Sequence, residues 1–108
     1  MKVKYVDNAL LFKALSDPTR LIIIDMLSCG ELCACVILEK FEFTQPTLSY
    51  HMKALCDSGL VNGRKQGKWM YYSLNEDMIK NVKMFLDEIS APKDDCVCKE
   101  NDCVLVCD

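Results

Sequence analysis

The feature of the sequence that most constrains the fold is a pair of candidate helices, residues 31–40 and 44–59, joined by a short break. The second begins at Thr44, a residue type that caps helix N-termini, and stops near Gly59. Residues 60–74 follow as two segments rich in strand formers around a glycine turn, which is typical of a β-hairpin. This order predicts a helix-turn-helix followed by a hairpin, or wing.

Further helices are expected on both sides of this unit. One is predicted over residues 7–15, and another begins at SDPTR, with Asp17 as its N-cap, and ends near Gly30. A last helix follows Asn75, and its broad apolar stripe contains Met78, Ile79, Val82, Phe85, Leu86 and Ile89. The fold is therefore expected to be mainly α with a small β-hairpin, a winged helix-turn-helix whose last helix packs against the first helix and a second subunit.

The 108 residues suit one domain, which we place at residues 1–91, followed by a Cys-rich acidic tail at residues 92–108. The net charge of −3 hides a gradient along the chain. Residues 43–72 contain four Lys or Arg against one Asp, a balance of +3, whereas residues 94–108 contain one Lys against five Asp or Glu, a balance of −4. A polyanion such as DNA is therefore expected to meet the middle of the chain and not the tail.

The predicted second helix and the hairpin carry polar and basic side chains of the kinds that contact bases and phosphates. The predicted DNA-binding residues are Gln45, Thr47, Ser49, Tyr50, His51, Lys53, Arg64, Lys65 and Lys68. For any one of them taken alone, an ordinary solvated face is the favoured interpretation, whereas the whole set followed by a basic wing favours DNA binding. His51 is predicted to contact a base or a phosphate, with a packed core position as its alternative, and Arg20 is expected to contact either a phosphate or an acidic side chain.

Eight cysteines are the unusual element of the composition. No export signal or apolar run long enough to span a membrane is recognisable, so we expect a cytoplasmic protein with reduced thiols and no membrane partner. Clustered reduced thiols indicate soft-metal binding or redox chemistry. The predicted metal ligands are Cys33, Cys35, Cys96, Cys98, Cys103 and Cys107. Cys56 and Cys29 suit the alternative that a small thiol acts as a buried apolar group.

The ligand types narrow the choice of ion. A single histidine among eight cysteines disfavours a zinc site built from His and carboxylate. Thiolates select soft ions, of which trivalent arsenic or antimony takes three in a pyramid, and Cd(II) or Pb(II) accepts three or four. We therefore expect no permanent cofactor, but As(III) or Sb(III) as a reversible ligand, with Cd(II) or Pb(II) as the alternative.

The segments DPTRLIIIDML, GELCAC, TQPTLSYHMKALCDSGLV and RKQGKWMYYSL together resemble the ArsR/SmtB family of bacterial metal-sensing repressors. The resemblance covers about residues 7–90 and lies in the order and spacing of these motifs. It implies a winged-helix homodimer through its first and last helices, in agreement with the apolar stripe of the last helix. Such a dimer binds double-stranded operator DNA when metal-free and releases it when metal binds. The arsenic-responsive type of the family is the expected one, with arsenical resistance as the regulated process.

The resemblance also implies where the metal binds. The ELCAC box is similar to the family's arsenic site, a CxCxxC run on the first helix of the helix-turn-helix, but Leu38 stands at the third cysteine position. The tail cysteines then form a site alone or lend a ligand to Cys33 and Cys35. On a regular helix, thiols two residues apart face directions about 200° apart. We therefore predict that ion binding distorts residues 31–37 and disturbs the DNA-reading helix.

Two alternatives of other classes stay open: a thiol-redox switch on the same scaffold, and a protein that sequesters metal. Metal-free release by oxidant would favour the first, and absence of operator binding would favour the second. An enzyme is not expected, because no paired carboxylates, phosphate-binding glycine loop or nucleophile beside His51 can be recognised.

Overall fold

The computed structural model describes residues 2–92 of the chain, with side chains from residue 4. The tail cysteines Cys96, Cys98, Cys103 and Cys107 lie outside the described residues. Along the described chain, the order of elements is α1 (Lys2–Leu15), α2 (Pro18–Leu27), β1 (Leu32–Cys33), α3 (Ala34–Leu38), α4 (Gln45–Asp57), β2 (Val61–Gln66), β3 (Trp69–Leu74) and α5 (Glu76–Ser90). None of the helices in this part of the chain is long and apolar enough to cross a membrane.

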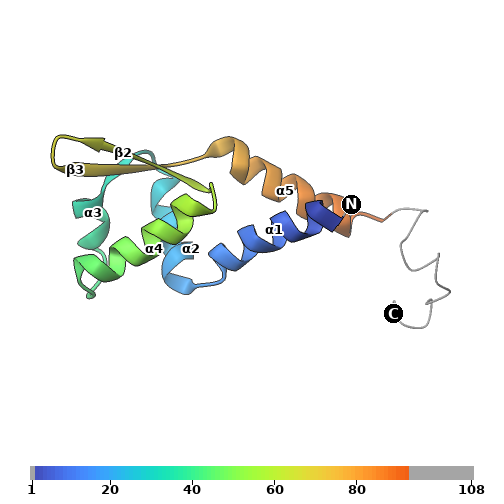
Figure 1. Ribbon diagram of the computed structural model, residues 1–108, viewed down its shortest axis with the longest axis horizontal. Coiled ribbons are helices and arrows are strands. Elements are labelled where there is room, and N and C mark those ends of the chain that lie inside the picture. The colour runs from blue at the N-terminus through green and yellow to red at the C-terminus, as the bar shows by residue number, and fades with distance from the viewer. Residues whose placement is uncertain (1, 93–108) are drawn as a thin grey trace.

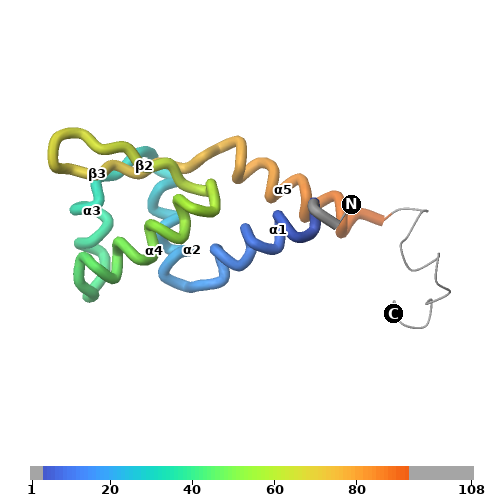
Figure 2. Tube along the Cα trace, viewed as in Figure 1, coloured from blue at the N-terminus to red at the C-terminus, as the bar shows by residue number. Residues whose placement is uncertain are grey.

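Two parts of the molecule can be followed in Figure 1: a body built from α2, α3, α4 and the sheet, and an arm in which α1 and α5 run side by side. The arm is held by aromatic contacts, since the Phe85 ring lies 5.9 Å from that of Tyr5 and 6.2 Å from that of Phe12. Lys4 and Glu88 form an ion pair nearer the end of the arm. The chain trace in Figure 2 shows the hairpin and the arm at opposite ends of the molecule.

The body closes around a small apolar core. Its fully buried large side chains are Ile23, Ile37, Met52, Leu55 and Leu60. Three helices and the start of the hairpin contribute to this set, so α4 is fixed from its inner side. Leu48, Met52 and Leu55 form the predicted buried stripe of α4, with exposed fractions of 2%, 1% and 0%.

Local sequence signals locate most helix ends. The Asp17 carboxylate accepts hydrogen bonds from the backbone N–H groups of Thr19 and Arg20, so it caps α2 as expected. Asn75 caps α5 in the same way by accepting from the Met78 N–H at 3.2 Å. The first helix begins at Lys2, five residues before the predicted start.

The sheet is antiparallel with strand order β1-β3-β2, and the hairpin is confirmed. Its two-residue turn lies between Gln66 and Trp69, with Gly67 at φ +64°, a conformation that favours glycine. The prediction of a helix over residues 31–40 is wrong at its beginning. Leu32 and Cys33 form a strand that pairs with Tyr72 and Tyr71 of β3, and the helix begins only at Ala34.

Candidate functional site

The outer face of α4 carries most of the side chains that were expected to meet DNA. Leu48, His51, Met52 and Leu55 are the buried residues of α4, so its opposite side faces outward. The exposed residues of this face are Gln45, Thr47, Ser49, Tyr50 and Lys53. Tyr50 is 66% exposed, and Lys53 forms a solvent-exposed ion pair with Asp57 at 3.0 Å. This face is polar, and the ion pair is too exposed to hold Lys53 firmly.

His51 is not on this face, so its side chain is not exposed for the predicted contact with a base or a phosphate. Its side chain is 9% exposed, and its Nδ1 accepts a hydrogen bond from Arg20 Nε at 3.2 Å. The Phe43 ring lies 5.9 Å from the imidazole, and the Tyr50 ring lies 5.4 Å from it. The Arg20 guanidinium also lies 5.5 Å from the Tyr50 ring, so Arg20 and His51 together position the exposed Tyr50. The alternative of a packed histidine is the one that fits.

The hairpin presents its basic side chains beside α4. Arg64, Lys65 and Lys68 are all exposed, and Lys68 Nζ lies 6.0 Å from the centre of the Trp69 ring. Arg64 has an additional partner that the sequence did not reveal. Its Nε and Nη2 donate to the two carboxylate oxygens of Glu31 at 2.8 and 2.7 Å. Glu31 was missed because 33 residues separate it from Arg64 and no local pattern connects them.

Cys33 and Cys35 lie together, which the helical spacing did not predict. Cys33 has an extended backbone (φ −69°, ψ 144°) and acts as the N-cap of α3, so the rotation of a regular helix does not separate the two side chains. The Cys35 thiol donates to Cys33 Sγ at a distance of 2.8 Å. The premise that the helix must distort to bring these thiols together is therefore wrong.

The two thiols have different acidities. Cys33 Sγ accepts hydrogen bonds from the Cys35 thiol and from the Cys35 backbone N–H, and these hold the pKa of Cys33 below its ordinary value. The pKa of Cys35 is raised, because its proton is engaged by the Cys33 sulfur. A thiolate thus forms first at Cys33, with its neighbour still protonated beside it.

A third ligand for this pair is not present in the part of the chain that the structure describes. Across residues 2–92, no three Cys, His, Asp or Glu side chains come together in a group able to hold a metal ion. Cys56 is half-buried, and burial together with the nearby Asp57 charge raises the pKa of its thiol, which suits a packing role. Cys29 is exposed in the turn after α2, so the expectation that it acts as a buried apolar group is wrong.

A pocket of about 210 Å³ opens beside Cys35 where α3, α4 and β3 meet. Its lining includes Cys35, Leu38 and Leu48, together with Gln45 and Ser49 from the exposed face of α4. Cys35 therefore lies close to residues of the candidate DNA-reading face of α4. A group bound at Cys35 that fills this pocket would lie beside α4.

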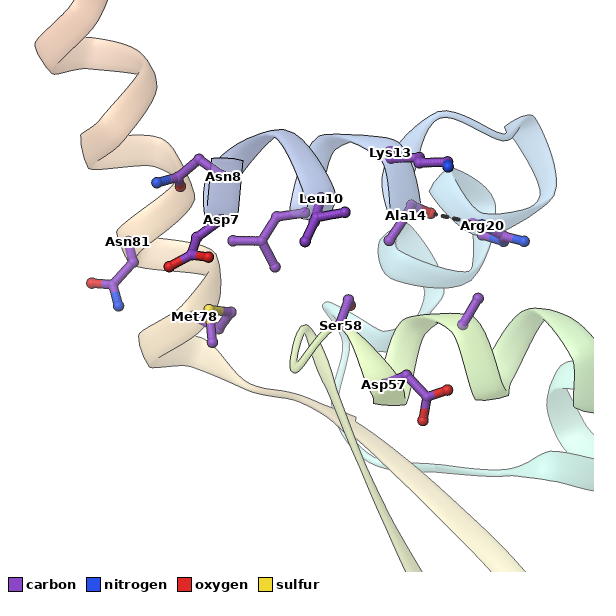
Figure 3. Close-up of a pocket in the computed structure, with 12 residues that line it drawn as sticks. Asp7, Asn8, Leu10, Lys13, Ala14, Arg20, Asp57, Ser58, Met78 and Asn81 are labelled. Atoms are coloured by element: carbon purple, nitrogen blue, oxygen red, sulfur yellow. Dashed lines mark hydrogen bonds between the residues drawn. The ribbon is translucent and has the colours of Figure 1, made fainter. Parts of the chain in front are cut away.

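A larger cavity, of about 680 Å³, lies between α1, α4 and α5 (Figure 3). Asp7, Asn81 and Met78 line one side of it, and Arg20, which donates to the Ala14 carbonyl, lines the other. Its lining contains neither cysteine nor histidine. This cavity is consequently separate from the thiol chemistry.

Comparison with known sequences identifies close relatives. Residues 17–63 match the profile of a family described as "Bacterial regulatory protein, arsR family". The chain is 48% identical over 97 residues to an arsenical resistance operon repressor of Staphylococcus xylosus, covering 90% of this chain and 93% of that protein. It is also 42% identical over 86 residues to a cadmium resistance transcriptional regulatory protein CadC homolog of Staphylococcus aureus, covering 77% and 71%.

The fold is shared with solved structures of regulators. An ArsR-like transcriptional regulator from Rhodococcus sp. RHA1 superposes with a TM-score of 0.71 at 26% identity, covering 95% of this chain and 90% of that one. HlyU from Vibrio cholerae superposes with a TM-score of 0.70 at 29% identity, covering 85% and 100%. These structures agree with the predicted winged helix-turn-helix.

Proposed function

Because the chain belongs to the arsR family of bacterial regulatory proteins, whose members are transcription regulators and not enzymes, we propose that it represses transcription from operator DNA and is released by a thiophilic ion. The bound form is a homodimer, and the inducer is As(III) or Sb(III) held by cysteine thiolates. Such a repressor acts where the DNA is, in the bacterial cytoplasm. The observation that carries the proposal is the contact between Cys33 and Cys35 at the start of α3.

Two thiols in contact are prepared to share one ion. Each As–S bond replaces an As–O bond of arsenite, and the thiol proton leaves with the displaced hydroxide as water, so no electrons are transferred. The lowered pKa of Cys33 favours the first such bond. The names of the relatives support this choice, since one is an arsenical resistance repressor and another a cadmium resistance regulator.

The DNA-binding face in this proposal consists of the exposed residues of α4 and the basic wing. Gln45, Thr47 and Ser49 reach the bases, and Lys53, Lys65 and Lys68 contact phosphates. Arg64 joins this surface from the half of β2 nearer the turn, and Tyr50 is presented by Arg20. His51 is a positioning residue, because it accepts the hydrogen bond that holds Arg20 beside Tyr50.

The tail beyond residue 92 either supplies the third ligand to Cys33 and Cys35 or forms a second site alone. If the tail completes the site at Cys33 and Cys35, ion binding ties the tail to the start of α3. If the tail forms its own site, Cys33 and Cys35 are dispensable for release. The two arrangements predict opposite results for a protein with Cys33→Ser and Cys35→Ser: release of DNA is lost in the first arrangement and retained in the second.

Operator release, measured by fluorescence anisotropy in reducing buffer, tests the proposal. The DNA is a duplex that the wild-type protein selects from a random pool, and arsenite, Cd(II) and Zn(II) are titrated separately. We expect arsenite to weaken binding by about 5- to 150-fold, the range typical of coupling between two sites, with little effect of zinc. Release by Cd(II) alone would replace the metalloid with a soft divalent ion, and no release by any of the three would contradict metal sensing.

Matched serine variants locate the sensing site. Cys33→Ser with Cys35→Ser should abolish release, whereas Cys29→Ser with Cys56→Ser should leave it unchanged. Replacement of the four tail cysteines, Cys96, Cys98, Cys103 and Cys107, shows whether the tail supplies a ligand. Full release by the Cys33/Cys35 variant would assign sensing to the tail alone.

The same sulfur contact favours one second candidate function, a thiol-redox switch. Sulfur atoms 2.8 Å apart need only a small further approach to reach the bond length of about 2.05 Å in a disulfide. Peroxide would oxidise the two thiols to one disulfide and be reduced to two waters. Release of the DNA by peroxide in metal-free buffer, prevented by Cys35→Ser, would support this function over metalloid sensing. Metal sequestration is distinguished by a failure to bind any DNA duplex.

A further inference from the structure

Three residues from three different strands form one row across the sheet. Cys33 of β1 pairs with Tyr71 of β3, and Tyr71 pairs with Arg64 of β2. Directly paired residues of antiparallel strands project from the same face. The thiol-bearing residue and the basic residue of the wing therefore share one face of the sheet, with the tyrosine between them. The Arg64 guanidinium lies 4.7 Å from the centre of the Tyr71 ring.

Glu31 connects the two ends of this row through an ion pair with Arg64. It immediately precedes β1, and both of its carboxylate oxygens accept hydrogen bonds from Arg64. Arg64 Nη1 also donates to Gln66 Oε1 at 2.6 Å, so the guanidinium is held on a second side. Because β1 and β2 are not neighbours in the sheet, this ion pair is a direct side-chain connection between the thiol segment and the outer strand of the wing.

The fork-shaped geometry of the pair makes it sensitive to small movements. Two parallel N–H···O bonds to one carboxylate require the two groups to be coplanar and in register. Glu31 lies two residues from Cys33 on the same short segment. Any rearrangement of residues 31–35 when an ion bonds to the two sulfurs therefore changes the position of the carboxylate that holds Arg64.

We propose that Glu31 is a positioning residue that couples the thiol pair to the wing through its ion pair with Arg64. In the ion-free protein, Glu31 sets the direction in which Arg64 and the outer wing strand face the DNA. When the thiols are bridged, the pair shifts or opens, and the wing is no longer held in its DNA-binding position. This inference deepens the proposed function and rests on it for the identity of the inducer.

Substitutions that remove the Glu31–Arg64 ion pair are not expected to unfold the protein. The side chains of Arg64 and Glu31 are 52% and 35% exposed, and ion pairs at such positions add little to stability. Glu31→Gln keeps the size of the side chain and removes its charge. A matched control is Glu39→Gln, which removes the same charge from an exposed position at the end of α3.

The wing contains its own reporter. Trp69 is the one tryptophan of the chain, is the first residue of β3 and is 49% exposed. Phenylarsine oxide is the probe, because its arsenic bonds to two neighbouring thiols and its oxygen leaves as one water with their two protons. Trp69 emission is followed in the full-length protein during the titration. A Cys33→Ser/Cys35→Ser protein provides the blank for the remaining cysteines.

We expect wild type and Glu39→Gln to show an emission change that the serine blank lacks, and Glu31→Gln to show less than about half of it. Arg64→Lys, which keeps the charge but loses the fork, should give the same loss, and the double variant no more than either single one. In the DNA assay, Glu31→Gln should reduce the arsenite-induced loss of affinity by about 2- to 30-fold.

Two results would overturn the inference. One is that Trp69 emission of the wild type does not change when its thiols are bridged. The other is that the emission change of Glu31→Gln is as large as that of Glu39→Gln. Because the probe bridges thiols whatever the natural inducer, this measurement is separate from the proposed function. If arsenite failed to release DNA from the wild type, metalloid sensing would be contradicted, and the emission comparison would still decide the role of Glu31.

Discussion

At the scale of single residues, Cys33 and Cys35 differ in acidity although only Ala34 separates them. The hydrogen bonds that Cys33 accepts lower the pKa of its thiol, and the donor role of Cys35 raises the pKa of the second thiol. A lowered pKa means that the thiolate persists to lower pH, and the thiolate is the nucleophile. The pair should therefore react in a fixed order.

We expect iodoacetamide at neutral pH to alkylate Cys33 at least about twice as fast as Cys35. Cys35→Ala removes the donor, so the inflection of the Cys33 pH–rate profile should move to higher pH. Peptide mapping by mass spectrometry measures both rates, and Cys56, with its raised pKa, is the internal slow reference. Identical pH–rate profiles for Cys33 and Cys35 would disprove the assignment of donor and acceptor.

His51 supports the DNA-reading face from inside, through Arg20. His51→Ala leaves a half-buried guanidinium without this acceptor, so we expect the free energy of unfolding to fall by about 1–3 kcal/mol. Urea denaturation measures the loss, and His51→Gln, which can still accept a hydrogen bond, should lose less. DNA affinity should fall for every duplex alike. A loss confined to one base pair, with unchanged stability, would instead indicate a direct base contact.

The sequence predicts residues whose partners are local and misses those whose partners are distant. Asp17 and Asn75 were recognisable because a helix cap bonds to groups two or three residues away. The partner of His51 is 31 residues away, and nothing in a helical pattern marks it. Helical spacing fails to predict the contact between the two thiols for a different reason: the backbone of Cys33 is extended and not helical.

At the scale of elements, the error over residues 31–33 has a tertiary cause. The segment has the apolar spacing of a helix, but Leu32 and Cys33 find backbone partners on β3. A two-residue strand has no periodicity to detect, and pairing across the sheet overrides the local preference. The longer elements α4, α5 and the hairpin were predictable because each combines a periodic pattern with a capping or turn residue.

The wing makes a prediction of its own. Lys65 and Lys68 project into solvent from the outer part of the hairpin, so in our proposal they contact phosphates and not bases. Lys65→Gln and Lys68→Gln should each weaken binding to operator and to unrelated DNA alike. Each should reduce the slope of log affinity against log salt concentration by about 1. Lys80→Gln on α5 is the control with the same charge change, and loss of discrimination between the two DNAs would show base reading instead.

At the scale of the whole molecule, the arm carries apolar side chains that the single chain does not bury. On α1 and α5 these are Tyr5, Val6, Leu10, Met84, Leu86 and Ile89, each between 42% and 59% exposed. The single chain thus buries only part of the broad apolar stripe predicted on the last helix, since Val82 and Phe85 are buried and Leu86 and Ile89 are exposed. Exposed apolar surface of this kind marks an interface, which supports the proposed homodimer.

Charge placed on this arm should separate the subunits. In a twofold interface each substitution occurs twice, and Leu86→Glu would bury two unpaired carboxylates. We expect self-association to weaken by at least about 100-fold, equivalent to about 2.8 kcal/mol. DNA affinity should fall with it, because a monomer contacts only one half-site. Val36→Glu, an exposed apolar position on α3 away from the arm, should leave the dimer intact. Sedimentation equilibrium measures the association constants, and a Leu86→Glu protein that remains dimeric would place the interface elsewhere.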